Sequence, residues 1–134
     1  MVAGSVYTLK PLRILIVDDS QTARRMLRAI LWSRQWTVCE AEDGMSGVQK
    51  FEELKPDAVV LDLAMPDIDG VEAAKRMAAV NPEVPLILFT VLEIQGLEKP
   101  AQEAGISAVV PKNHAWSLIG NIENLVQRAA PPSM

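Results

Sequence analysis

Apolar residues in this chain fall into two kinds of segment. Five short runs are apolar almost throughout, which is typical of strands buried on both faces of a parallel sheet. We expect strands over residues 13–17, 36–41, 57–63, 84–89 and 107–111. The longer segments between them carry an apolar residue every three or four positions, which predicts helices with one buried face. Strands that alternate with helices predict an α/β fold with helices on both faces of the sheet.

Two of the expected helices carry clear signals. Ser20 directly precedes the first helical segment and is a favoured N-cap residue. In the third helical segment, Val71, Ala74 and Ala78 recur at helical spacing, so we expect them on its buried face.

Breaker residues predict an irregular fourth unit. Gly96 and Pro100 lie where a regular helix is expected, so that helix should be short. Pro100 is tolerated as the first residue of a helical turn, which leaves residues 101–104 as the helical part. Pro111 ends the fifth strand, and a proline within a strand favours a position at the sheet edge.

Composition narrows the class of protein. The chain has 134 residues, 49% of them hydrophobic, which suits one domain with a single core. We expect that domain over residues 11–129, with tails at 1–10 and 130–134. No apolar stretch approaches the roughly 18 residues of a membrane span, and the first ten residues do not resemble a secretory signal, so we expect no membrane insertion and a cytoplasmic protein. The net charge of −4 argues against a nucleic-acid partner.

Charged residues follow three of the expected strands. Asp18 and Asp19 come directly after the first strand, Asp62 lies at the end of the third, and Lys112 follows the fifth. The carboxyl ends of parallel strands meet at one edge of the sheet, so we expect these side chains to converge. Carboxylates that share a crevice repel one another unless cations lie between them. The pattern therefore predicts a site for a divalent metal and a phosphoryl group.

These residues occur with further ones in a familiar order. Thr90 ends the fourth strand, and Met65-Pro66 and Gly70 follow Asp62. The whole set resembles a response regulator receiver domain, and the match covers nearly the whole chain. The resemblance implies a flavodoxin-like, doubly wound sheet of five parallel strands in the order 2-1-3-4-5. It also implies two-component (phosphorelay) signal transduction.

The resemblance assigns a role to each of the three aspartates at the strand ends. Asp62 looks like the phosphoacceptor, and Asp18 and Asp19 look like the acids that hold the metal. Mg²⁺ (or Mn²⁺) is the implied cofactor, with Asp62 and the backbone carbonyl of Ala64 completing the protein ligands. Mg²⁺ prefers oxygen ligands and keeps several waters, so a few carboxylates suit it.

The formal charges at this site balance only with a metal. Asp18, Asp19 and Asp62 contribute −3, against +2 from the metal and +1 from Lys112. Phosphorylation of Asp62 would bring up to about two negative charges. By resemblance, Lys112 and the hydroxyl of Thr90 meet the phosphoryl oxygens, and the inward movement of Thr90 shifts a loop equilibrium.

The resemblance also implies partners. The phosphoryl group would come from a histidine kinase, a phosphotransfer protein or a small phosphodonor. We expect a stand-alone receiver that signals to a downstream protein through the face formed by the fourth helix, the fifth strand and the fifth helix. Beyond its own phosphorylation and autodephosphorylation, we do not expect an enzyme.

Three positions depart from the family pattern. Asn113 follows Lys112 where the family usually has a proline with a cis peptide, and the non-proline cis form costs roughly 2.5–4 kcal/mol. Val91 replaces a small residue, and Val109 replaces the aromatic residue of the family's switch. We therefore expect altered or weak coupling from Thr90 to the surface, with metal binding and phosphorylation retained.

Two other functions compete with this interpretation. The three departures also suit a receiver-like interaction module that does not depend on phosphorylation. A Mg²⁺-dependent phosphohydrolase with an aspartyl-phosphate intermediate is a third possibility. Such enzymes place two acids two residues apart, however, whereas Asp18 and Asp19 are adjacent.

Simpler roles are expected for several other residues. One segment, Asp67-Ile68-Asp69-Gly70, resembles part of a calcium-binding loop. The first and last ligand positions of such a loop would be Met65 and Arg76, which carry no carboxylate, so we exclude a calcium site here. The remaining candidates for ordinary roles are His114 as a helix cap, three tryptophans in helix and strand packing (Trp32, Trp36 and Trp116), and a solvated basic helix face (Arg24, Arg25 and Arg28).

Overall fold

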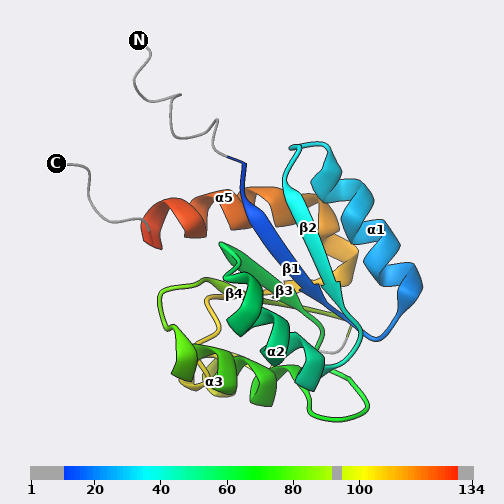
Figure 1. Ribbon diagram of the computed structural model, residues 1–134. Coiled ribbons are helices and arrows are strands. Elements are labelled where there is room, and N and C mark those ends of the chain that lie inside the picture. Colours follow the sequence, from blue (N-terminus) through cyan, green and yellow to red (C-terminus); the bar gives the residue numbers. More distant parts are fainter. Residues whose placement is uncertain (1–10, 92–94, 130–134) are drawn as a thin grey trace, which may run out of the picture.

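The computed structural model describes residues 11–91 and 95–129, in which strands and helices alternate (Figure 1). The expected tails, 1–10 and 130–134, lie outside the described residues. The elements in chain order are β1 (Arg13–Val17), α1 (Gln21–Trp32), β2 (Thr37–Ala41), α2 (Gly44–Leu54), β3 (Ala58–Leu61), α3 (Gly70–Val80), β4 (Leu86–Thr90), α4 (Glu98–Glu103), β5 (Ala108–Pro111), the 3-10 helix η3 (Lys112–Ser117) and α5 (Leu118–Ala129).

The five strands form one parallel sheet. Their order is β2-β1-β3-β4-β5, which confirms the predicted doubly wound fold. β5 is an edge strand, so Pro111 lies where its missing N–H removes no central ladder hydrogen bond. The central strands β1, β3 and β4 are buried on both faces except at Arg13, which explains why their sequences are apolar without alternation.

Helices cover the two faces of the sheet in separate layers. Alternate strand residues point to opposite faces, so Leu15 and Val17 pack with α2, α3 and α4, while Ile14 and Ile16 pack with α1 and α5. Figure 1 shows α1 and α5 on one side of the sheet and α2 and α3 on the other. The carboxyl ends of the strands lead into the loops before the next helices, except that η3 follows β5 directly.

Side-chain caps begin α1, α2 and α3, three of the four long helices in the described residues. Ser20 accepts from the N–H of Ala23, as predicted, and begins α1. Asp43 caps α2 and Asp69 caps α3, each by accepting an N–H three residues on. A cap of this kind contributes about 1 kcal/mol. The acidic residues of these loops therefore include several whose roles are structural.

Helix α4 corrects one prediction. It is short, as expected, but it begins at Glu98 rather than at Pro100. Pro100 is the third helical residue, where its missing N–H would have no partner within the helix. The helix therefore tolerates the proline two positions later than the first-residue placement that we predicted.

The buried face of α3 was also predicted only in part. Ala74 is buried, but the other fully buried side chains of the helix are Ala73 and Met77. Val71 and Ala78 lie at the edge of this face and are half-buried. Both Val71 and Ala78 still pack against the core, so the predicted stripe borders the buried face instead of forming its centre.

Two of the three tryptophans differ from the packing role expected for them. Trp36 is buried against the α1 and α5 layer, but Trp32 is 73% exposed and Trp116 is 81% exposed.

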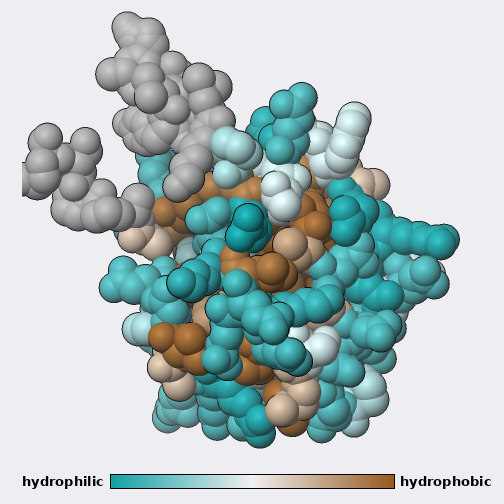
Figure 2. Space-filling model, viewed as in Figure 1, coloured by the Kyte–Doolittle hydropathy of each residue, from teal (hydrophilic) through white to brown (hydrophobic). Residues whose placement is uncertain are grey.

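Figure 2 shows polar and charged side chains over most of the face it presents, with apolar residues between the helices. Among the described residues, no helix has both the length and the apolar character to cross a bilayer.

Candidate functional site

Strand register brings the predicted acidic residues level with one another. Val17 at the end of β1 pairs with Leu61 at the end of β3, so Asp18 and Asp62 are the next residues on neighbouring strands. The N–H of Asp62 donates to the carbonyl of Val17 at 2.9 Å, which continues the ladder by one residue. The two carboxylates therefore emerge side by side at the same edge of the sheet.

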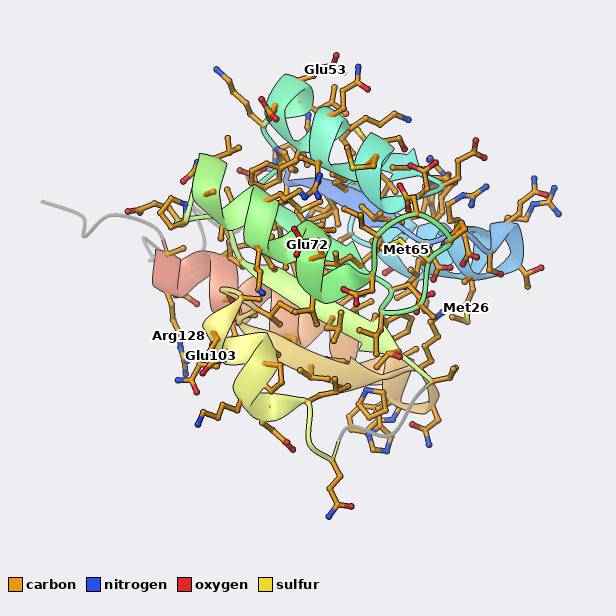
Figure 3. All side chains as sticks on the ribbon, turned by 90° about the horizontal axis from the view of Figure 1, so that it is seen from below. Met26, Glu53, Met65, Glu72, Glu103 and Arg128 are labelled. Carbon is orange, nitrogen blue, oxygen red and sulfur yellow. The ribbon has the colours of Figure 1, made fainter. Side chains whose placement is uncertain are left out.

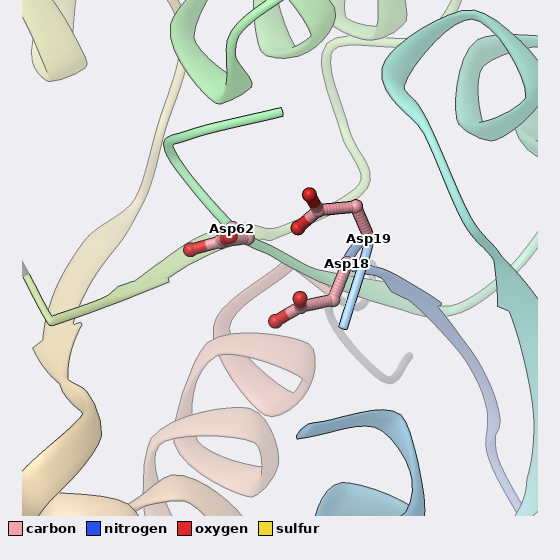
Figure 4. A group of neighbouring side chains, drawn as sticks. All are labelled: Asp18, Asp19 and Asp62. Atoms are coloured by element: carbon pink, nitrogen blue, oxygen red, sulfur yellow. The ribbon is translucent and has the colours of Figure 1, made fainter. Parts of the chain in front are cut away.

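Three carboxylates gather at this edge (Figure 4). One oxygen each from Asp18, Asp19 and Asp62 lies within 4.8 Å of the others. Asp18 and Asp62 are buried, with 1% and 8% exposure, while Asp19 is exposed. The predicted convergence of these three residues is therefore present in the structure.

Lys112 reaches the same site from the end of β5. Its Nζ lies 2.9 Å from Asp18 Oδ2 and 3.5 Å from Asp62 Oδ1. The ring of Phe89 lies below the ammonium, with its centroid 5.9 Å away. The peptide bond between Lys112 and Asn113 is trans.

The pKa of Asp62 is raised above its usual value. Burial is the larger cause, and the neighbouring charge of Asp18 adds to it. Lys112 opposes both effects without cancelling them. Asp62 is therefore a carboxylate whose negative charge is poorly compensated by the protein.

Thr90 lies at the carboxyl end of β4 and is 1% exposed. It pairs in register with Pro111, the residue before Lys112. Thr90 and Lys112 therefore leave neighbouring strands at the same edge, as the resemblance implies. Val91, the next residue, is 76% exposed.

The loop after β3 is packed tightly against the strand that precedes it. The N–H of Gly70 donates to the carbonyl of Leu63 at 2.8 Å. A Cβ atom at position 70 would collide with the backbone carbonyl of Asp62. Only glycine permits this approach, which holds the end of the loop against the backbone of Asp62.

Asp67 in the same loop has a role that the sequence did not reveal. Its carboxylate accepts the N–H groups of Gly44 at 3.0 Å and Met45 at 2.7 Å, at the start of α2. These bonds lower the pKa of Asp67 to about 2. The segment does not form a calcium loop, in agreement with the sequence analysis. Its two aspartates instead accept N–H groups at helix N-termini, Asp67 from α2 and Asp69 from α3.

The basic cluster on α1 was predicted as a solvated face. This is wrong for Arg24, whose side chain is only 12% exposed, while Arg25 and Arg28 are exposed as expected. Arg24 donates to Glu40 at 3.0 Å and to the carbonyl of Asp18 at 2.7 Å. Arg28 donates to the other oxygen of Glu40 at 2.6 Å. The partner, Glu40, lies on β2, and nothing in the local sequence pairs it with α1.

His114 does not have the capping role expected for its side chain. It lies within η3, and its backbone carbonyl accepts from Ser117 Oγ at 2.9 Å. Its ring lies 5.8 Å from that of Trp116.

Two methionines lie on the same side of the molecule as the site. Figure 3 shows Met26 of α1 and Met65 of the loop after β3 on the side toward which β4 and β5 point, with Glu103 and Arg128 far from them. Met26 is 39% exposed and Met65 is half-buried.

The donor set suits a hard divalent cation. Three carboxylates within reach of one point, two of them buried, offer the oxygen ligands that Mg²⁺ and Mn²⁺ prefer. A cation among them would also lower the raised pKa of Asp62, since it would offset both the burial and the charge of Asp18.

A family model described as the response regulator receiver domain matches residues 14–122. Response regulator MprA of Mycobacterium sp. (strain KMS) is 31% identical over 122 residues, covering 90% of this chain and 53% of the relative. Chemotaxis protein CheY of Listeria monocytogenes is 41% identical over 78 residues, covering 58% and 66%. The chain thus spans about half the length of the first of these relatives.

Solved structures have the same architecture. The response regulator domain of Thermotoga maritima CheB superposes with a TM-score of 0.82 at 29% identity, covering 92% of this chain and all of that one, 100%. A two-component response regulator of the LuxR family from Aurantimonas sp. gives 0.83 at 29% identity, covering 89% and 87%.

Proposed function

Because the chain belongs to the response regulator receiver domain family, we propose that Asp62 accepts a phosphoryl group in two-component signalling. The donor is a histidine kinase, a phosphotransfer protein or a small phosphodonor such as acetyl phosphate. The observation that carries the proposal is the position of one ammonium between two buried carboxylates, with Lys112 Nζ at 2.9 Å from Asp18 and 3.5 Å from Asp62.

In the proposed reaction, a carboxylate oxygen of Asp62 attacks the phosphorus atom of the donor. A new O–P bond forms, and the bond from phosphorus to the leaving nitrogen or oxygen breaks with its electron pair on the leaving group. Such transfers depend mainly on positioning and on stabilisation of negative charge. The poorly compensated charge of Asp62 supports its role as the nucleophile, because burial leaves the carboxylate weakly solvated.

Asp18, Asp19, Asp62 and the Ala64 carbonyl would hold a divalent cation, Mg²⁺ or Mn²⁺. When bound, the cation would neutralise charge on the phosphoryl oxygens. Lys112 would bind one phosphoryl oxygen and the Thr90 hydroxyl another, as in the family. The Lys112 ammonium would then leave its contact with the Asp62 carboxylate and bind the phosphoryl oxygen instead.

Intact mass spectrometry tests the proposal. The protein is incubated with acetyl phosphate and Mg²⁺, and one phosphoryl adduct is expected per chain. Asp62→Asn and a chelator should each abolish the adduct, and Asp57→Asn, at an acid bonded to the N–H of Arg13, is the matched control that should keep it. An adduct that persists in Asp62→Asn would contradict the proposal.

The surface that would bind a downstream protein is the one predicted from the family resemblance, which is formed by α4, β5 and α5. We propose that phosphorylation changes the affinity of this face for a downstream protein. The stand-alone arrangement and the cytoplasmic location expected from the sequence stay predictions.

A receiver-like module that binds its partner without phosphorylation is the second candidate. Val109 packs against the core beneath α4 and has no ring or hydroxyl to rotate outward. This observation favours weak coupling between Thr90 and the surface. The module predicts partner binding that is unchanged in Asp62→Asn, whereas a phosphorylation switch predicts that the variant loses the response to acetyl phosphate.

A further inference from the structure

The guanidinium of Arg24 connects the acidic cluster to β2. Its Nη1 donates to the backbone carbonyl of Asp18 at 2.7 Å, and its Nε donates to Glu40 Oε1 at 3.0 Å. The Arg24 side chain is only 12% exposed. A planar group with two acceptors in fixed positions has little freedom to reorient.

The carbonyl that Arg24 binds belongs to the peptide unit that joins Asp18 to Asp19. A peptide unit is planar, so the direction of its carbonyl also sets the direction in which the chain enters Asp19. Arg24 therefore acts on the orientation of Asp19 without touching its side chain.

The two acids depend on this contact to different degrees. Asp18 is also held by its N–H on Ala41, by the N–H of Ser20 on Oδ1 and by Lys112 on Oδ2. The side chain of Asp19 is exposed, so surrounding side chains do not enclose it. The backbone sets the direction of the Asp19 Cα–Cβ bond, from which the carboxylate comes within 4.8 Å of those of Asp18 and Asp62.

We propose that Arg24 is a positioning residue, which orients the Asp18–Asp19 peptide so that the Asp19 carboxylate faces Asp62. This inference rests on the proposed function, because the cation is what the oriented carboxylate would bind. Residues that orient metal ligands typically change metal affinity by about 10- to 100-fold when mutated.

Glu40 holds Arg24 in place. Burial would raise the pKa of Glu40, but hydrogen bonds from Arg28 and Arg24 outweigh it and lower the pKa. Glu40 therefore stays ionised and fixes the guanidinium from the side opposite Asp18. Arg28 shares this carboxylate, at 2.6 Å, and its other hydrogen bond goes to the carbonyl of Val38 on β2.

The shared carboxylate makes Arg28 a matched control. Arg24→Ala and Arg28→Ala each remove one ion pair to Glu40, but only the first removes the contact to the Asp18 carbonyl. Mn²⁺ binding is measured by the electron paramagnetic resonance signal of the free ion, with thermal unfolding in chelator to compare stability. We expect Arg24→Ala to weaken Mn²⁺ binding about 10-fold. We expect Arg28→Ala to change it by less than about 2-fold, as for a surface ion pair.

Arg24→Lys separates charge from geometry and remains informative if Arg24→Ala does not fold. One ammonium cannot reproduce the two fixed donors, so we expect at least about a 3-fold weakening. Wild-type affinity in Arg24→Lys would overturn the proposal, because charge alone would then suffice.

Two outcomes distinguish this inference from the proposed function. Equal Mn²⁺ affinity in Arg24→Ala and the wild type would overturn the positioning role and leave the cation site intact. A wild-type protein that binds no Mn²⁺ would overturn the cation site, and the positioning role with it. At saturating Mg²⁺, the Arg24→Ala protein should still form the phosphoryl adduct, because its defect is in affinity.

Discussion

Asp62 and Asp67 lie five residues apart in one loop, and their carboxylates have opposite electrostatic environments. The pKa of Asp62 is raised by burial and by Asp18. The pKa of Asp67 is lowered to about 2, chiefly by the N–H of Met45, although its side chain is exposed. Exposure to solvent alone therefore does not decide the pKa of these two carboxyl groups.

The difference lies in what each carboxylate faces. Asp67 accepts two N–H groups from the start of α2, where unpaired donors and the helix dipole favour an anion. Asp62 faces another carboxylate and a single shared ammonium. Asp67 stabilises the fold, whereas Asp62 carries a poorly compensated negative charge that a bound cation would offset.

Gly70→Ala should have the largest effect, because it disrupts the loop that carries both Asp62 and Asp67. The added Cβ would meet the backbone carbonyl of Asp62, which cannot move aside. We expect the free energy of unfolding to fall by about 3 kcal/mol in urea titrations. Gly120→Ala in α5 is the control, since its Cβ meets nothing within 4 Å, and a gain of about 0.5–1 kcal/mol is expected there. Similar losses in both variants would argue against the steric explanation.

Asn substitutions of the two acids should shift stability in opposite directions. Without metal, Asp62→Asn removes a charge that is unfavourable in the fold, so its melting temperature should rise. Asp67→Asn loses two charge-assisted hydrogen bonds, so its melting temperature should fall. Differential scanning fluorimetry in chelator measures both. Mg²⁺ should then raise the melting temperature of the wild type more than that of Asp62→Asn.

The pH dependence of the Asp67 effect has a defined sign. A pKa of about 2 in the fold, against an ordinary value of 3.8, means that ionised Asp67 stabilises the native state above about pH 4. This contribution is lost as the pH falls through about 2. The gap between the melting temperatures of the wild type and Asp67→Asn should therefore narrow between about pH 4 and pH 2. A gap that stays constant over this range would contradict the assignment.

Asp62 should show the reverse dependence. Because its pKa is raised in the fold, protonation favours the native state, and the relative stability of the wild type should increase as the pH falls toward that pKa. Stability curves of the wild type and Asp62→Asn in chelator should therefore converge on acidification. Divergence on acidification would show that Lys112 outweighs burial and Asp18.

The smallest effect is expected from an exposed acid without backbone donors. Glu72 pairs with Arg76 one turn along α3 at 3.0 Å, and both side chains are 43% exposed. Glu72→Gln should cost only about 0.3–0.5 kcal/mol in urea unfolding, and less at high salt. A loss as large as that of Asp67→Asn would mean that charge in this region, rather than the N–H contacts, sets stability.

Much of the fold followed from local patterns. Apolar runs marked the strands, Ser20 marked the start of α1, and Pro111 indicated an edge strand. The start of α4 at Glu98 was missed because a proline is acceptable anywhere in a first turn. The exposure of Trp32 and Trp116 was missed because an aromatic residue near a helix end carries no signal of the side to which it turns.

By itself, the sequence determined the α/β fold and the kind of chemistry at the strand ends, because strand and helix periodicities and the residues that end each run are local. The tertiary structure decided which charges meet. Lys112 binds Asp18 from 94 positions away, Arg24 of α1 binds Glu40 of β2, and Asp67 binds the start of α2. These partners are chosen by strand register and helix packing, which bring together residues that no local pattern connects.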